Sequence, residues 1–116
     1  MAEVLIVEDD ARVSRMLQAA IEHAGHAIFA AVRNATQAVE ALAARRPDVA
    51  VLDLRLGGGQ LSYPVAEELK RQGVPFVFMT GFAAQAIDPV FAPSIVLRKP
   101  VRPGELLAVL RALTMR

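Results

Sequence analysis

The most informative part of the sequence is Val4-Leu5-Ile6-Val7-Glu8-Asp9-Asp10, near the start of the chain. Four consecutive apolar residues without polar alternation predict a strand that is buried on both faces, as in a parallel sheet. Three acidic residues then place negative charge directly beyond the end of that strand. The next segment carries apolar residues at helical spacing, and Asp9 or Asp10 can cap its first turn. The stretch therefore predicts a strand-to-helix unit with charge at its turn.

The rest of the chain repeats this alternation. Apolar runs at 27–31, 49–52, 75–79 and 95–97 predict four more strands, and segments of helical period separate most of them. Asn34 and Gln37 resemble a capping box, and Pro103 can open the last helix. The segment from Gly81 to Ser94 contains two prolines and leaves room for only a short helix. Strands alternating with helices predict an α/β protein with a flavodoxin-like parallel sheet covered on both faces.

Composition limits the class of protein. The chain has 116 residues and is 54% hydrophobic, which suits one compact domain spanning 1–116. Its formal net charge is +1, and the basic residues are dispersed, which argues against nucleic-acid binding and against a membrane anchor. There is no cysteine, so thiol chemistry and cysteine-based metal sites are excluded. We expect a soluble cytoplasmic protein without an output domain.

Polar residues recur just beyond the ends of the predicted strands. They are Glu8, Asp9 and Asp10 after the first strand, Asp53 after the third, Thr80 after the fourth and Lys99 after the fifth. In an open α/β sheet the ligand crevice lies outside these carboxyl ends. We therefore expect residues from four strands to converge on one site.

The carboxylates of this site would repel one another. At a separation of ~5 Å and an effective dielectric constant of about 20, each pair costs roughly 3 kcal/mol. A hard divalent cation removes that cost, and oxygen ligands favour Mg²⁺. With the metal bound, Asp53 becomes a candidate nucleophile toward a phosphoryl group, Lys99 an electrostatic clamp and Thr80 a hydroxyl donor.

Each of these residues also has a simpler interpretation. A single aspartate after a strand is commonly a turn residue or a helix cap, and this is our interpretation of Asp10. The glycines Gly57–Gly59 lack the Lys-Ser/Thr ending of a P-loop and predict a flexible loop. His23 and His26 flank a turn without a third ligand, so we interpret both as structural. Only the combination of residues at four strand ends is specific.

The whole chain resembles the receiver (CheY-like) domain of two-component response regulators. The residues that carry the resemblance are Leu5-Ile6-Val7-Glu8-Asp9-Asp10, Val51-Leu52-Asp53-Leu54-Arg55-Leu56, Met79-Thr80-Gly81 and Arg98-Lys99-Pro100. The resemblance implies a three-layer sandwich whose strand order is 2-1-3-4-5. It implies a phosphorylation site at Asp53 and a cis Lys99–Pro100 bond. It also implies direct Mg²⁺ ligation by Asp9 and Asp53, ligation by Glu8 through water, and ligation by the backbone carbonyl of Arg55.

Three features depart from the usual receiver pattern. The strand-five position that usually carries an aromatic switch residue is Val96. The loop after Asp53 reads Gly57-Gly58-Gly59-Gln60 in place of the common Pro-x-x-Asp-Gly turn, and the segment between Thr80 and the fifth strand is short. These features are similar to a divergent group of single-domain receivers.

The resemblance implies a signalling module and not an enzyme. A histidine kinase or a histidine phosphotransfer protein would phosphorylate it, and an unknown downstream protein would read the change. Two alternatives stay open. A small aspartyl-phosphate phosphatase would commonly carry a second acid two residues after the nucleophile, where this chain has Arg55. A pseudo-receiver that acts only through protein contacts would be expected to lack an acidic residue or the lysine, and this chain has both.

Overall fold

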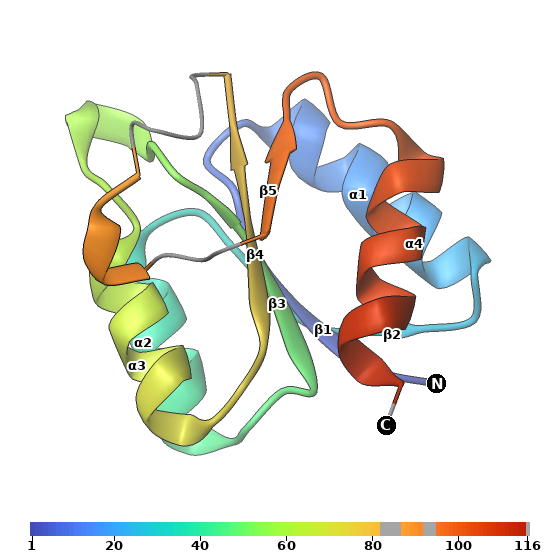
Figure 1. The fold of residues 1–116 in the computed structure, drawn as a ribbon, viewed down its shortest axis with the longest axis horizontal. Coiled ribbons are helices and arrows are strands. Elements are labelled where there is room, and N and C mark those ends of the chain that lie inside the picture. The colour runs from blue at the N-terminus through green and yellow to red at the C-terminus, as the bar shows by residue number, and fades with distance from the viewer. Residues whose placement is uncertain (82–86, 92–94, 116) are drawn as a thin grey trace.

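The computed structural model describes residues 1–81, 87–91 and 95–115, which form a five-stranded parallel sheet between two layers of helices (Figure 1). The strand order is β2-β1-β3-β4-β5, so the predicted flavodoxin-like fold and its order 2-1-3-4-5 are confirmed. The strands are β1 (Glu3–Val7), β2 (Ala27–Val32), β3 (Val49–Asp53), β4 (Phe76–Thr80) and β5 (Ile95–Arg98). The helices are α1 (Ala11–His23), α2 (Ala35–Ala44), α3 (Tyr63–Gln72) and α4 (Pro103–Thr114), with short 3₁₀ turns at Gly57–Gly59 and Pro89–Phe91.

Each of the five strands extends by one residue beyond the apolar run that predicted it. Thr80 pairs with Arg98 in the ladder between β4 and β5, and Asp53 pairs with Met79 between β3 and β4. Hydrogen bonding between parallel strands does not stop where a side chain becomes polar, because the backbone carries the ladder. The predicted site residues Asp53 and Thr80 therefore belong to the strands themselves.

The helix termini follow the sequence signals, with one difference. Asp10 caps α1 and accepts hydrogen bonds from the backbone N–H groups of Arg12 and Val13, as predicted. Asn34 caps α2 and accepts from the N–H of Gln37 at 2.8 Å. In a standard capping box the Gln37 side chain would return to the N–H of the cap residue. Here Gln37 Oε1 instead accepts from the N–H of Arg33, one residue earlier, at 3.0 Å.

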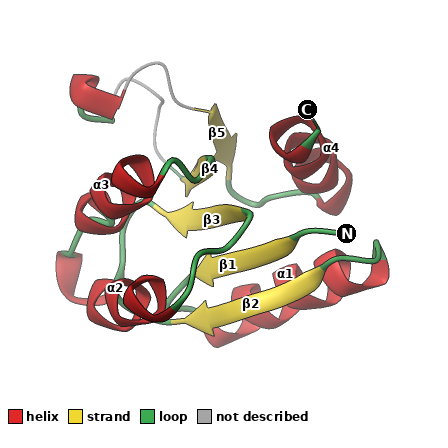
Figure 2. Cartoon of the chain, turned by 90° about the horizontal axis from the view of Figure 1, so that it is seen from below, coloured by secondary structure: helices red, strands yellow, loops and turns green. Residues whose placement is uncertain are grey.

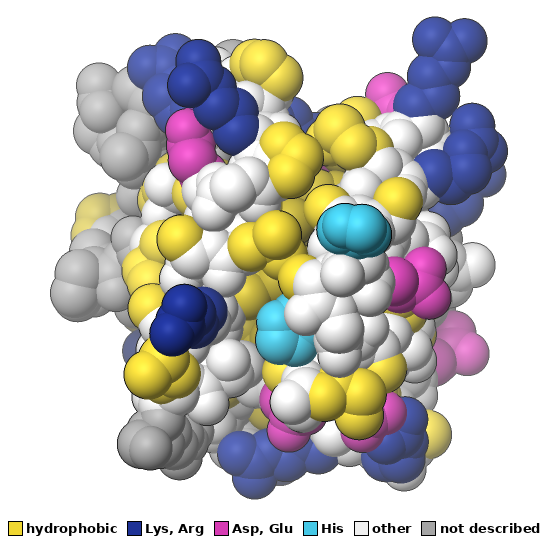
Figure 3. Space-filling model, turned by 90° about the vertical axis from the view of Figure 1, so that its right-hand side faces the viewer, with side chains coloured by type: hydrophobic (Ala, Val, Ile, Leu, Met, Phe, Trp, Pro, Cys, Tyr) yellow, Lys and Arg dark blue, Asp and Glu magenta, His cyan; other side chains and the backbone are white. Residues whose placement is uncertain are grey.

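Helices cover both faces of the sheet (Figure 2). The hydrophobic core accordingly lies in two halves, one on each face. Under α2 and α3 the buried residues include Leu5, Leu42, Leu52, Leu69 and Phe78. Under α1 and α4 they include Ile6, Leu17, Ile21, Leu106 and Leu110. Because β1 and β3 are buried on both faces, their side chains serve the two halves alternately, as the unbroken apolar runs predicted. Figure 3 shows the outer side of α1 and α4, where hydrophobic side chains remain visible among charged ones.

Most of the segment predicted to hold a short helix, between Gly81 and Ser94, lies outside the described residues. Its described part contains the 3₁₀ turn Pro89–Phe91, which is anchored on the start of α3. The rings of Phe91 and Tyr63 stack at 4.9 Å, and the Tyr63 hydroxyl accepts a hydrogen bond from the N–H of Asp88 at 2.7 Å. Val96 pairs with Phe78 and is partly buried against the core under α2 and α3.

Among the helices of the described residues, none combines the length and apolar character that a bilayer span requires. The Lys99–Pro100 peptide bond is cis, as the resemblance implies.

The packing of α1 predicts different costs for two substitutions on that helix. Ile21 is fully buried against the sheet, whereas Met16 is 42% exposed. We expect Ile21→Ala to lower the free energy of unfolding by about 2–5 kcal/mol, because it leaves a cavity in a closed core. Met16→Ala should change it by less than about 0.5 kcal/mol. Urea denaturation measures both, and equal losses would contradict this assignment of the buried face.

Candidate functional site

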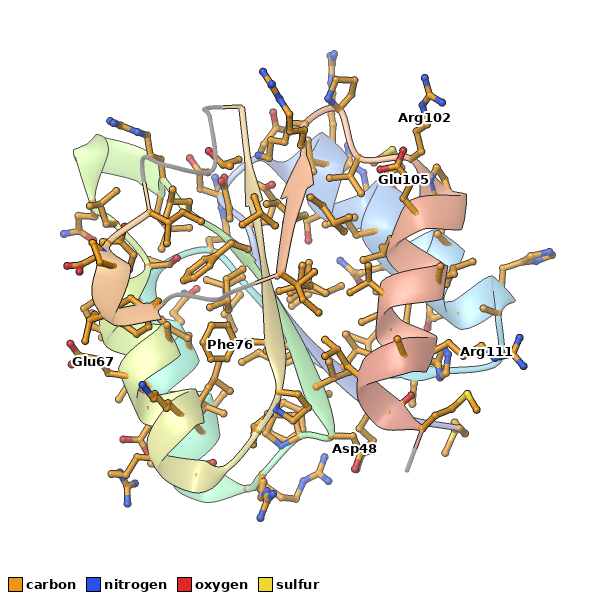
Figure 4. All side chains as sticks on the ribbon, viewed as in Figure 1. Asp48, Glu67, Phe76, Arg102, Glu105 and Arg111 are labelled. Atoms are coloured by element: carbon orange, nitrogen blue, oxygen red, sulfur yellow. The ribbon has the colours of Figure 1, made fainter. Side chains whose placement is uncertain are left out.

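The candidate site lies at the carboxyl ends of the strands, where backbone hydrogen bonds continue past the last strand residues. The N–H of Glu8 donates to the Val32 carbonyl at 3.0 Å, and the N–H of Lys99 donates to the Thr80 carbonyl at 2.9 Å. These bonds fix the first residue after β1 and the first residue after β5. In Figure 4, Arg102 and Glu105 mark this end of the molecule, and Asp48 lies at the opposite end of the sheet.

Lys99 joins the acidic residues of two other strands. Its Nζ lies 2.8 Å from Glu8 Oε1 and 3.0 Å from Asp53 Oδ2. Burial alone would lower the pKa of Lys99, but the hydrogen bonds and charges of Glu8 and Asp53 outweigh it and raise the pKa. The ammonium group is therefore held charged between two carboxylates. Lys99, Glu8 and Asp53 thus lie together at the strand ends, where the sequence pattern predicts that site residues converge.

Glu8 is the most deeply buried acid of the site, with no exposed surface. Its Oε1 accepts from Lys99, and its Oε2 accepts from the N–H of Asp10 at 3.1 Å. Burial raises the pKa of Glu8, and the neighbouring Asp53 adds to that effect, although the Lys99 hydrogen bond opposes it. Both carboxylate oxygens of Glu8 are thus engaged by the protein itself.

Three carboxylates form the candidate metal centre. Ligand oxygens of Glu8, Asp9 and Asp53 all lie within 4.8 Å of one another, and this is the one such acidic group found among the described residues. One ammonium group faces three carboxylates, which leaves an excess of negative charge. The all-oxygen donor set and this excess fit a hard divalent cation such as Mg²⁺.

Asp10 does not belong to this group. Hydrogen bonds from the N–H groups of Val13 and Arg12 lower the pKa of its carboxyl, which caps α1. The three consecutive acids therefore have separate positions: Glu8 is buried, Asp9 is partly exposed at the site, and Asp10 is in the helix cap.

Thr80 and Arg55 occupy the positions that the sequence predicts. Thr80 is buried at the end of β4, and its backbone carbonyl accepts the hydrogen bond from the N–H of Lys99. Arg55 follows Asp53 by two residues, is exposed, and forms an isolated backbone bridge with Leu61. The predicted hydroxyl donor and the predicted carbonyl ligand remain predictions, because the structure places the residues without testing these roles.

Sequence reasoning missed two neighbours of Asp9. Arg33 Nη2 donates to the Asp9 carbonyl at 3.2 Å, and a Cβ atom placed at Gly57 would lie 3.3 Å from Asp9 Oδ2. The sequence predicts a flexible loop at Gly57–Gly59, whereas the structure has a 3₁₀ turn in which Gly58 and Gly59 adopt positive φ angles. The capping signal at Asn34 and Gln37 could have directed attention to Arg33, because Gln37 holds its backbone.

A comparison with protein-family models matches residues 4–111 to the response regulator receiver domain. Among curated proteins, the phyllosphere-induced regulator PhyR of Methylorubrum extorquens is 29% identical over 111 residues, which are 93% of this chain and 42% of that protein. The DNA-binding response regulator MtrA of Mycobacterium tuberculosis is 33% identical over 114 residues, which are 94% of this chain and 49% of that protein. The chain thus spans about half the length of the curated relatives it matches.

Among solved structures, SdrG from Sphingomonas melonis Fr1 is 33% identical with a TM-score of 0.85. The match covers 99% of this chain and 98% of that chain.

The crowded carboxylates predict that one charge removal stabilises the protein. We expect Asp9→Asn to raise the free energy of unfolding in EDTA by about 1 kcal/mol, because it relieves repulsion from Glu8 and Asp53. Glu67→Gln, on the exposed surface of α3, is the charge-matched control and should have an effect below about 0.5 kcal/mol. Urea denaturation measures both variants. A lower stability of Asp9→Asn would contradict the repulsion.

Proposed function

The chain belongs to the response regulator receiver domain family, and on that premise we propose that Asp53 accepts a phosphoryl group in a Mg²⁺-dependent reaction. The contact of Lys99 with both Glu8 and Asp53 carries the proposal. It places the charged ammonium group of Lys99 beside the carboxylate of Asp53, the last residue of the central strand β3. Glu8 and Asp9 lie close to that carboxylate. The donor would be the phosphohistidine of a histidine kinase or of a histidine phosphotransfer protein.

Asp53 would act as the nucleophile. One of its carboxylate oxygens forms a bond to phosphorus while the bond between phosphorus and the donor's imidazole nitrogen breaks. The imidazole keeps that electron pair and is left as neutral histidine after protonation. Lys99, which already contacts Asp53 Oδ2, would balance the charge that gathers at the site. Thr80 would donate its hydroxyl hydrogen to a phosphoryl oxygen.

The residues that would hold Mg²⁺ are Asp9 and Asp53 directly, Glu8 through water and Arg55 through its backbone carbonyl. The bound ion supplies positive charge that offsets the negative charge of the phosphoryl group. The structure supports an indirect role for Glu8, because Lys99 and the N–H of Asp10 already use its two oxygens.

The phosphorylated form would alter contacts with a downstream protein in the cytoplasm. Receiver domains are signalling domains, and this chain would be a switch and not a catalyst of an external reaction. A structure of SdrG from Pseudomonas melonis Fr1, described as the BeF3-activated conformation, is similar to this chain. It is 34% identical with a TM-score of 0.83 and covers 97% of this chain and 96% of that chain. The likeness supports an acceptor site of the same kind here.

Two other functions have less support. A phosphatase that uses an aspartyl-phosphate intermediate commonly has a second acid where this chain has the exposed Arg55. A pseudo-receiver would be expected to lack part of the site, whereas Glu8, Asp9, Asp53 and Lys99 are all present and in close proximity.

Phosphorylation should occur at one position. We expect acetyl phosphate with Mg²⁺ to add about 80 Da, the mass of one HPO₃ group, and Asp53→Asn to abolish that addition. Intact-mass spectrometry measures the adduct, and Asp48→Asn, at the opposite end of the sheet, is the matched control. Persistence of the adduct in Asp53→Asn would show that another residue is the acceptor.

Removal of the two acids after β1 should weaken Mg²⁺ binding unequally. We expect Glu8→Gln to reduce the affinity about tenfold, which is typical of a residue that acts through water or another ligand. Asp9→Ala removes a direct ligand and should reduce it further. Titration of the backbone amide signals with Mg²⁺ gives both dissociation constants. Equal affinity of Asp9→Ala and the unsubstituted protein would contradict direct ligation.

A further inference from the structure

Asp9 lacks the side-chain support that the other two acids have. Glu8 and Asp53 are both held by Lys99, and Glu8 also accepts the N–H of Asp10. Within the ranges 1–81, 87–91 and 95–115, no side chain or backbone group donates a hydrogen bond to the Asp9 carboxylate. Its position must therefore come from its backbone and from the atoms that pack against it.

We propose that Arg33 and Gly57 are positioning residues that hold Asp9 in place to bind Mg²⁺. The inference rests on the proposed function, because it assigns a task to residues around the same metal centre. Arg33 acts on the backbone of Asp9, and Gly57 leaves space for its carboxylate. Neither residue would touch the metal ion.

Arg33 fixes the turn between β1 and α1 from the side of β2. Its Nη2 donates to the Asp9 carbonyl at 3.2 Å, directly after the bond from the Glu8 N–H to the Val32 carbonyl at 3.0 Å. Two consecutive residues of the turn are thus tied to two consecutive residues at the end of β2. The backbone of Arg33 is held in turn, because its N–H donates to Gln37 Oε1 at 3.0 Å. The hydrogen bond from the Arg33 N–H to Gln37 in α2 therefore holds Arg33, which in turn holds the backbone of Asp9.

Gly57 lies near Asp9 on the other side of β1, in the loop that follows β3. A Cβ atom at Gly57 would lie 3.3 Å from Asp9 Oδ2, so a side chain there would push the carboxylate. Gly58 and Gly59 differ, because they have positive φ angles and open space beside them. Glycine is thus required at 58 and 59 by the positive φ angles of the backbone, whereas at Gly57 the absence of a side chain leaves space for the Asp9 carboxylate. Arg33, Gly57 and Asp9 line one open cavity of about 430 Å³ with Asn34 and Gln37.

The charge of Arg33 and its hydrogen bond predict opposite effects on Mg²⁺ binding. A nearby positive charge repels a cation, so its removal by itself would strengthen binding. Loss of the hydrogen bond would release the Asp9 backbone and weaken binding, as loss of a residue that orients a metal ligand commonly does. The sign of the change therefore separates the two roles.

The first test replaces Arg33. We expect Arg33→Met to weaken Mg²⁺ binding about tenfold in a titration followed by backbone amide NMR. Arg33→Lys keeps a charged donor and should lie closer to the unsubstituted protein. Arg12→Met removes a charge in the exposed first turn of α1 and is the control, for which unchanged or stronger binding is expected. Unchanged or stronger Mg²⁺ binding by Arg33→Met would overturn the role of Arg33.

The second test adds one methyl group at Gly57. Gly57→Ala should weaken Mg²⁺ binding about tenfold while the unfolding midpoint in EDTA stays near that of the unsubstituted protein. Gly104→Ala, in the first turn of α4 with open space around it, is the control and should leave the affinity unchanged. Full Mg²⁺ affinity in Gly57→Ala would overturn the role of Gly57.

Phosphorylation at saturating Mg²⁺ separates this inference from the proposed function. A positioning defect should be overcome by excess Mg²⁺, so Arg33→Met and Gly57→Ala should both recover the adduct at Asp53. If the unsubstituted protein also fails to form the adduct, the proposed function is wrong. If only the variants fail at saturating Mg²⁺, the two residues do more than position Asp9 and the inference is wrong in that form.

Discussion

The structure depends most on the contacts of one ammonium group, that of Lys99. It follows β5, at one edge of the sheet, and binds Glu8 after β1 and Asp53 at the end of β3. Without a cation at this place, the negative charges at the ends of the central strands would oppose the close approach that the parallel ladder requires. The same contact leaves an excess of negative charge, which is why the site suits a divalent cation. Stability and the proposed chemistry thus come from the same charge arrangement.

The acids of the first turn show how neighbouring residues of one type acquire different tasks. Glu8 continues the β1 ladder through the Val32 carbonyl and is buried. Asp10 completes the first turn of α1 and has its carboxylate bound by backbone N–H groups. Asp9 lies between these two fixed residues, and its carboxylate stays accessible at the site. The strand before it and the helix after it therefore separate a structural acid, a proposed metal ligand and a helix cap within three consecutive residues.

Much of the fold and of the site could be predicted from the sequence, because the signals are local. Unbroken apolar runs marked the buried strands, and polar residues after them marked the edge where the site lies. The residues at which the strands end were predicted less accurately. Thr80 and Arg98 pair through backbone atoms, and the pattern of apolar side chains gives no information about that pairing. Arg33 and Gly57 could not be predicted for another reason: they lie near Asp9 only once the β2–α2 turn and the β3–α3 loop both approach the β1–α1 turn. The stacking of Tyr63 on Phe91 likewise joins residues 28 positions apart in sequence.

The stacked pair of Tyr63 and Phe91 has a spectroscopic consequence. The chain contains one tyrosine and no tryptophan, so the emission excited at wavelengths beyond the absorption of its five phenylalanines comes from Tyr63. That ring rests on Phe91, meets Phe78 edge-on at 6.0 Å, and carries the hydroxyl that receives the Asp88 N–H. Its emission therefore reports on the contact between α3 and the Pro89–Phe91 turn. The protein thus has one tyrosine fluorophore, located where Asp88 and Phe91 contact the start of α3.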